Sequence, residues 1–133
     1  MAQYSAAVAN AMLDQFETTI GASAVMKIRT GAAPATVATA DSGTVLATIN
    51  LPADWMAAAS GGSKAKSGTW SDTSADATGT AAHYRIYASD GTTCHQQGTV
   101  TLTAGGGDLT VDSTSFNAGQ MFTVTAYNLS YNI

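Results

Sequence analysis

The strongest constraint on the fold is the stretch from Thr80 to Thr103, which has the pattern of two strands joined by a tight turn. Asp90-Gly91 lies at its centre, and this dipeptide favours a two-residue hairpin turn because it adopts positive φ angles at low cost. On both sides of the turn apolar and polar residues alternate, as they do in a strand with one face on a core. A single hairpin is not stable in water, so other strands must cover its apolar face.

Further short strand patterns occur along the rest of the chain, separated by small and turn-forming residues. We expect strands at 24–30, 44–51, 68–71, 108–112 and 120–128. Short strands at this spacing predict an all-β protein, an antiparallel β-sandwich or a jelly-roll-like barrel, in a single domain. The expected core residues are Ala82, Tyr84, Ile86, Val100, Leu102, Phe122 and Val124.

The N-terminal region has a different period. Val8, Met12, Phe16 and Ile20 recur every fourth residue, which predicts one amphipathic α-helix, with Ser5 as its N-cap and Gly21 just after its end. Residues 1–22 would form this helical arm and residues 23–133 the β-sandwich. The helix packs either on its own sandwich or on a neighbouring subunit, because a lone helix ahead of an all-β chain is often an assembly arm.

Charged residues make up only 11% of the chain, and the net charge is −4. The five cations are too few for phosphate contacts, so we expect no nucleic-acid partner. No segment approaches the roughly 20 apolar residues that span a bilayer, so we expect no membrane partner. The low charge fits either a surface that a partner protein covers or an uncharged, hydroxyl-rich surface exposed to water.

The sequence has no complete catalytic, cofactor or metal motif, so we expect none of these sites. Cys94 and His95 are neighbours on a predicted strand and would point to opposite faces, which is a poor arrangement for a nucleophile and its base. Asp72 and Asp76 lack the spacing of a calcium loop and are better explained as turn residues. Ser60 to Gly68 is rich in Gly and Ser and is interpreted as a mobile loop.

Trp55 and Trp70 are the chain's two tryptophans, and they flank that loop. Two interpretations are open for them. Either the indole rings anchor the core, or one of them anchors a contact between subunits, where tryptophan is enriched.

Three segments carry a resemblance to a known family: Leu51 to Ala59, Gly68 to Asp72 and Gly79 to Tyr87. Their residues, LPADWMAAA, GTWSD and GTAAHYRIY, are similar to those of small virion proteins of tailed bacteriophages, and the resemblance extends from about Met26 to Val124. It implies a non-enzymatic structural protein, a capsid decoration or cement protein on the outside of the head. It also implies synthesis in the host bacterial cytoplasm, a homotrimer, and the major capsid protein or other virion proteins as partners.

Two other functions are kept as alternatives. One is another virion component, in the tail or at the head–tail junction. The other is a carbohydrate-binding β-sandwich that would use Trp55, Trp70 or Tyr87 as stacking platforms. The candidate interface residues are Val8, Met12, Phe16, Trp55, Trp70 and Tyr87.

Overall fold

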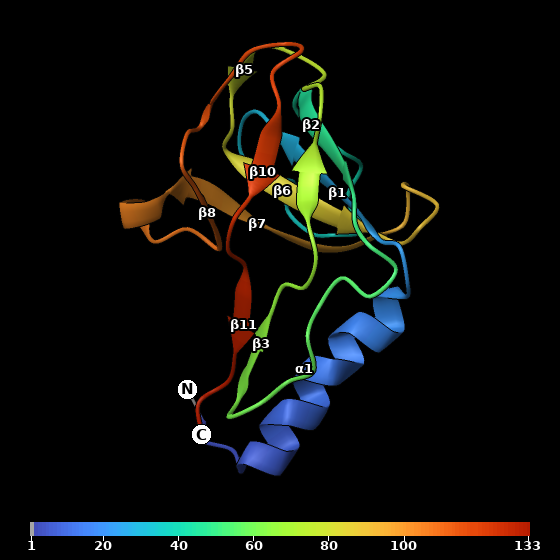
Figure 1. Ribbon diagram of the computed structural model, residues 1–133, viewed down its shortest axis with the longest axis vertical. Helices are drawn as coiled ribbons and strands as arrows, with labels where there is room; N and C mark the ends of the chain where they lie inside the picture. Colours follow the sequence, from blue (N-terminus) through green and yellow to red (C-terminus); the bar gives the residue numbers. More distant parts are fainter. Residues whose placement is uncertain (1) are drawn as a thin grey trace.

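A computed structural model describes residues 2–133 and is mostly β, with one N-terminal helix (Figure 1). The helix α1 spans Ala6–Ile20, as predicted. Its N-cap is Ser5, whose Oγ accepts a hydrogen bond from the Val8 N–H at 3.3 Å. The helix ends at Gly21, which has φ 93° and donates its N–H to the Glu17 carbonyl at 2.9 Å. No helix within residues 2–133 is long and apolar enough to cross a membrane.

The main element is a five-stranded sheet in the order β2-β1-β6-β7-β8, and it curls into a half-barrel (Figure 1). Its strands are β1 (Val25–Arg29), β2 (Val45–Asn50), β6 (His83–Tyr87), β7 (Cys94–Leu102) and β8 (Leu109–Val111). β2, β1, β6 and β7 are antiparallel to their neighbours, whereas β7 and β8 are parallel. The prediction of a wholly antiparallel sheet is therefore wrong at this edge.

The parallel pair forms because the chain reverses direction twice between β7 and β8: it returns along β7 as far as Thr99 and then turns again, so that β8 runs parallel to β7. A 3₁₀ turn η1 (Thr103–Gly105) follows β7, and the Gly107 N–H then donates to Thr101 Oγ1 at 2.9 Å. A Cβ at Gly105 or Gly107 would lie 2.7 or 2.8 Å from the Thr101 side chain, so the glycines allow this close return. Asp108 continues it, since its carboxylate accepts the Thr99 N–H at 3.0 Å.

Two segments far apart in the sequence form a ribbon beside the sheet. β4 (Trp70–Asp72) pairs with β10 (Phe122–Val124), and β3 (Ser63–Ala65) pairs with β11 (Asn128–Ser130), all antiparallel. The segment expected to be a mobile loop thus contains a strand, β3. A small pair, β5 (Gly79–Thr80) and β9 (Ser115–Phe116), completes the structure. In Figure 1 the β3–β11 part extends away from the sheet, next to α1.

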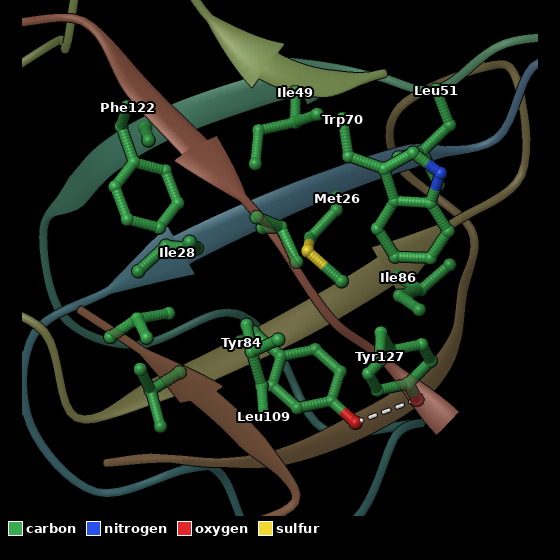
Figure 2. Packing of buried hydrophobic residues seen from close by; sticks show 14 of the residues in the cluster. Met26, Ile28, Ile49, Leu51, Trp70, Tyr84, Ile86, Leu109, Phe122 and Tyr127 are labelled. Atoms are coloured by element: carbon green, nitrogen blue, oxygen red, sulfur yellow. Dashed lines mark hydrogen bonds between the residues drawn. The ribbon is translucent and has the colours of Figure 1, made fainter. Parts of the chain in front are cut away.

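The core lies between the inner face of the sheet and the β4–β10 pair. Figure 2 shows Met26, Ile28 and Ile86 from the sheet facing Trp70 and Phe122 from that pair. Of the expected core residues, Tyr84, Ile86, Val100, Phe122 and Val124 are buried and Ala82 is half-buried. Leu102 is 51% exposed, which contradicts the prediction. Leu102 is the last residue of β7, immediately before η1, and its side chain lies outside the core there.

The central hairpin exists, but its turn is longer than predicted. β6 and β7 pair antiparallel, and the Ala88 N–H donates to the Thr93 carbonyl at 2.9 Å, leaving residues 89–92 as the loop. The Asp90 carboxylate accepts hydrogen bonds from the N–H groups of Thr92 and Thr93, both at 2.9 Å. Asp90 therefore stabilises a four-residue loop in which Gly91 supplies the positive φ of 71°.

Candidate interaction surface

The polar side of α1 is attached to the rest of its own chain. Asn10, Asp14 and Glu17 lie on one face of the helix, three or four residues apart. Their side-chain oxygens accept main-chain N–H groups of the segment before β3: Gly62 at 2.9 Å, Ala59 at 2.8 Å and Met56 at 3.2 Å. Of the two alternatives for the helix, packing on its own chain is the one that the structure supports for this face.

Lys64 strengthens this attachment from β3. Its side chain is only 1% exposed, and Nζ lies 2.7 Å from Asp14 Oδ1 and 3.1 Å from Glu17 Oε1. Nζ also donates to the Ala57 carbonyl at 2.9 Å. Burial by itself would lower the pKa of Lys64, but the hydrogen bonds to Asp14 and Glu17 outweigh it and raise the pKa. The same hydrogen bond from Lys64 is the main reason that the pKa of Asp14 is lowered.

The outward side of α1 carries no charge, because Asp14 and Glu17 are the only charged residues of the helix and both face Lys64. Its exposed residues are Ala6, Ala7, Val8, Ala11, Gln15, Thr18 and Thr19. The Val8 side chain is 48% exposed. This face is uncharged and consists of alanine, valine, glutamine and threonine, so it costs less to desolvate than a charged face would, which suits a protein contact.

Two shallow hollows lie beside this helix, and Met12 and Phe16 line both. The first has a volume of about 230 Å³ and is also lined by Leu129, Ser130 and Tyr131 of the C-terminal segment. The second, of about 270 Å³, reaches Ile20 and His95. We call the first hollow the helix groove; its lining residues are Met12, Leu13, Phe16, Gln96, Leu129, Ser130 and Tyr131. Val8, Met12 and Phe16 thus remain candidate contact residues.

The other three candidates, Trp55, Trp70 and Tyr87, are fully buried, at 0% exposure each. Trp55 donates its indole N–H to the Gly21 carbonyl at 2.9 Å, and Trp70 donates its own to the Trp55 carbonyl at 3.1 Å. The proposal that these side chains contact a partner or stack on a sugar is therefore corrected. Their rings fill the interior and their polar atoms are already hydrogen-bonded there, which is the core alternative considered for the tryptophans.

A polar cluster covers the outer face of the sheet, where Tyr87 lies. The Arg85 guanidinium donates to the carbonyls of Thr36, Val37 and Thr39 and to the carboxylate of Asp41. Arg29 forms a second ion pair with Asp41 at 3.1 Å, and Tyr87 donates its hydroxyl to Asp41 at 2.7 Å.

This cluster fastens the 31–44 loop over the sheet. Burial of Asp41 would raise its pKa, but the hydrogen bonds from Tyr87 and Arg85 outweigh this and lower the pKa. Burial is also the main reason that the pKa of Tyr87 is raised to about 12. All five N–H donors of the Arg85 guanidinium form hydrogen bonds to the loop or to Gln97, so none remains to bind a ligand.

The other chemically notable residues do not converge. Cys94 lines a hollow of about 480 Å³ beside Arg85 and Asp41, whereas His95 faces α1, so the two neighbours point to opposite sides as predicted. His83 is buried and donates Nδ1–H to the Gly31 carbonyl at 2.7 Å. Asp72 accepts the Ser74 N–H, as a turn residue does. Within residues 2–133, no group of three or more His, Cys, Asp or Glu could hold a metal ion.

Sequence reasoning missed Lys64 and the contribution of the C-terminal segment to the groove. A single lysine in a Gly- and Ser-rich segment looks like a solvated loop residue, so its burial had no sequence signal. Leu129 and Tyr131 did have a sequence signal. Together with Tyr127 they occupy odd positions, whereas the apolar residues Phe122 and Val124 of the preceding strand occupy even positions. That change of phase marks the passage from the β4–β10 pair to the β3–β11 pair. Comparisons of the chain with protein-family models, with curated proteins and with solved structures found no match.

Proposed function

We propose that this chain is a non-enzymatic structural protein of a tailed-bacteriophage virion, and specifically a capsid decoration protein that binds the outside of the head and stabilises it. The resemblance of the segments at 51–59, 68–72 and 79–87 to small virion proteins supports the class. The observation that carries the proposal is the uncharged outer face of α1 with the helix groove beside it. This is an arrangement for binding protein rather than for chemistry on a small molecule.

The distribution of charge favours this surface as the contact with other subunits. Within residues 2–133, six of the nine acidic residues form no ion pair with a cation, and copies of an acidic chain repel one another wherever such residues meet. On α1 the two acids both form ion pairs with Lys64, on the polar side of the helix, so one net negative charge remains there and none lies on the outer face. Two copies, or one copy and the major capsid protein, can therefore approach through Val8 and Met12 without bringing carboxylates into direct contact.

We further propose that the protein is a homotrimer. Closed cyclic symmetry is the usual result of self-association, and a decoration protein that sits on local threefold axes of a shell matches them best as a trimer. We also propose that the fold is a β-sandwich. The β4–β10 pair, which lies across the inner face of the curled sheet and shares its core, supports this proposal.

The test places a charge on the helix face. Val8→Glu combined with Met12→Glu should leave the urea unfolding midpoint close to that of the parent chain, since neither side chain is fully buried. The double variant should be monomeric by light scattering and should no longer co-sediment with undecorated phage heads. Leu102→Glu is the matched control, because Leu102 is exposed on the sheet, and it should still bind. A double variant that trimerises and decorates heads like the parent would overturn the proposal.

Imaging of the virion separates the alternatives. Density for the protein on the head surface supports a decoration protein, and density in a ring or tube at the tail supports another virion component. The carbohydrate-binding alternative required Trp55, Trp70 or Tyr87 to stack on a sugar, and all three rings are buried, so none of them can reach one.

A further inference from the structure

One edge of the β3–β11 ribbon has free main-chain hydrogen-bonding groups. The Lys66 N–H donates to the Tyr127 carbonyl and the Tyr131 N–H donates to the Gly62 carbonyl, both at 2.9 Å. These two bonds define the residues of β11 that face β3. Residues of an antiparallel strand alternate in the side to which their N–H and C=O groups point, so every second residue between Tyr127 and Tyr131 points these groups away from β3. Asn128 and Ser130 are those residues, and within residues 2–133 their main chains have no partner on that side.

Two other strand edges of the structure are closed. On the far side of β3, the Ala57 N–H donates to the Ala65 carbonyl, and Ser60 and Ser63 exchange two hydrogen bonds. The outer edge of β2 is occupied as well, because the Thr48 N–H donates to Asp72 Oδ2 at 2.9 Å. Natural proteins protect exposed strand edges in such ways against pairing with other chains. The edge of β11 has no such protection, and both Asn128 and Ser130 are exposed.

A segment of main chain already lies at one end of this edge. The Tyr4 N–H donates to the Asn132 carbonyl at 2.8 Å, and the rings of Tyr4 and Tyr131 pack edge to face at 5.7 Å. In Figure 1 the segment before α1 lies beside the C-terminal end of the chain, and β3 is the only strand paired with β11 within residues 2–133. The edge thus accepts extended main chain at Asn132, and the same geometry continues at Ser130 and Asn128.

The helix groove runs beside the same edge. Ser130 borders it together with Met12, Phe16 and Leu129, and none of its lining residues is charged. A strand added to β11 would place every second side chain toward α1, into this groove. A cavity of about 150 Å³ holds benzene, so the 230 Å³ here accommodate one aromatic or branched aliphatic side chain.

We propose that β11 and the helix groove form a docking site for an extended segment of a partner protein, which pairs with Asn128 and Ser130 as an added strand and inserts an apolar side chain between Met12, Phe16 and Leu129. Main-chain hydrogen bonds would supply the affinity, and the groove would select the inserted side chain. The site goes beyond the proposed function. It uses the same helix groove, but its test measures peptide binding by the isolated chain, so failure of this proposal and failure of the proposed function are separate outcomes.

The experiment selects ligands from a library of random seven-residue peptides against the full chain and measures their binding by fluorescence anisotropy. Bound peptides should carry an apolar residue that is essential for binding, and they should protect the amides of Asn128 and Ser130 from hydrogen exchange. Ser130→Pro removes an N–H that faces away from β3, a position where an edge strand tolerates proline. This variant should therefore fold and bind the peptides at least about tenfold more weakly, because it loses a hydrogen bond and introduces a clash.

Ser130→Ala is the matched control, because it changes the side chain and keeps the N–H; its affinity should stay within about twofold of the parent. Met12→Lys should weaken binding by charging the groove. If Ser130→Pro does not fold, the proposal is tested by the parent chain alone, in which bound peptide should protect the amides of Asn128 and Ser130 from hydrogen exchange. A selection without any enriched peptide, equal binding to the proline variant, or protection confined to other strands would overturn the proposal.

Discussion

Replacing Lys64 with methionine tests how the N-terminal helix is held in place. Methionine keeps most of the buried stem but removes the ammonium group, which lies 2.7 Å from Asp14 Oδ1, 3.1 Å from Glu17 Oε1 and 2.9 Å from the Ala57 carbonyl. The three acceptors lose a charged donor at the same time. The helix would then keep its apolar packing and the hydrogen bonds that its side-chain oxygens accept from main-chain N–H groups of the segment before β3.

The expected cost follows from the exposure of the partners. Removing one member of a fully buried ion pair costs about 3–5 kcal/mol. Here the Asp14 and Glu17 side chains are 47% and 20% exposed, so water can solvate them again in the variant. We therefore expect the free energy of unfolding to fall by about 2–3 kcal/mol.

Urea denaturation followed by tryptophan fluorescence measures this change. With a slope of about 1.5–2 kcal/mol per molar urea, the midpoint should fall by roughly 1–2 M. Hydrogen exchange of the α1 amides should also accelerate more than that of β1 or β6. Lys66→Met is the matched control, since Lys66 donates to the exposed Gly68 carbonyl and should cost less than about 1 kcal/mol. An equal effect of the two variants would refute the role given to Lys64.

Three further predictions concern the core, the loop and acid. Ile86→Ala should cost about 2–5 kcal/mol because Ile86 is 0% exposed, whereas Leu102→Ala should stay within about 0.5 kcal/mol; thermal unfolding compares the two. Arg85→Lys should release the 31–44 loop, visible as faster amide exchange there, because an ammonium group cannot replace the guanidinium's fork of donors. The lowered pKa of Asp14 means that its carboxylate stabilises the fold above its ordinary value of 3.8 and that this contribution disappears as the pH falls below it. Urea midpoints measured as the pH falls from about 5 should therefore decline less steeply in Asp14→Asn than in the parent, and parallel curves would contradict this assignment.

Local signals in the sequence determined the helix and the strands of the central hairpin. Ser5 and Gly21 bound α1 because capping depends on residues within one turn of the helix end. Alternation of apolar and polar residues located β6 and the inward direction of Tyr84 and Ile86, since the pleat of a strand has a period of two. These features need no knowledge of distant segments.

Tertiary structure decided which surfaces are covered. The polar face of β6 is as buried as its apolar face, because the 31–44 loop folds over Arg85 and Tyr87 and satisfies their polar atoms. Lys64 is buried for the same reason, since two carboxylates of α1 happen to reach it. Alternation tells which side chains share a face of a strand, but not whether a loop or a helix later covers that face. Only the placement of distant segments determined that Trp55, Trp70 and Tyr87 are interior and that Met12 and Phe16 line a groove.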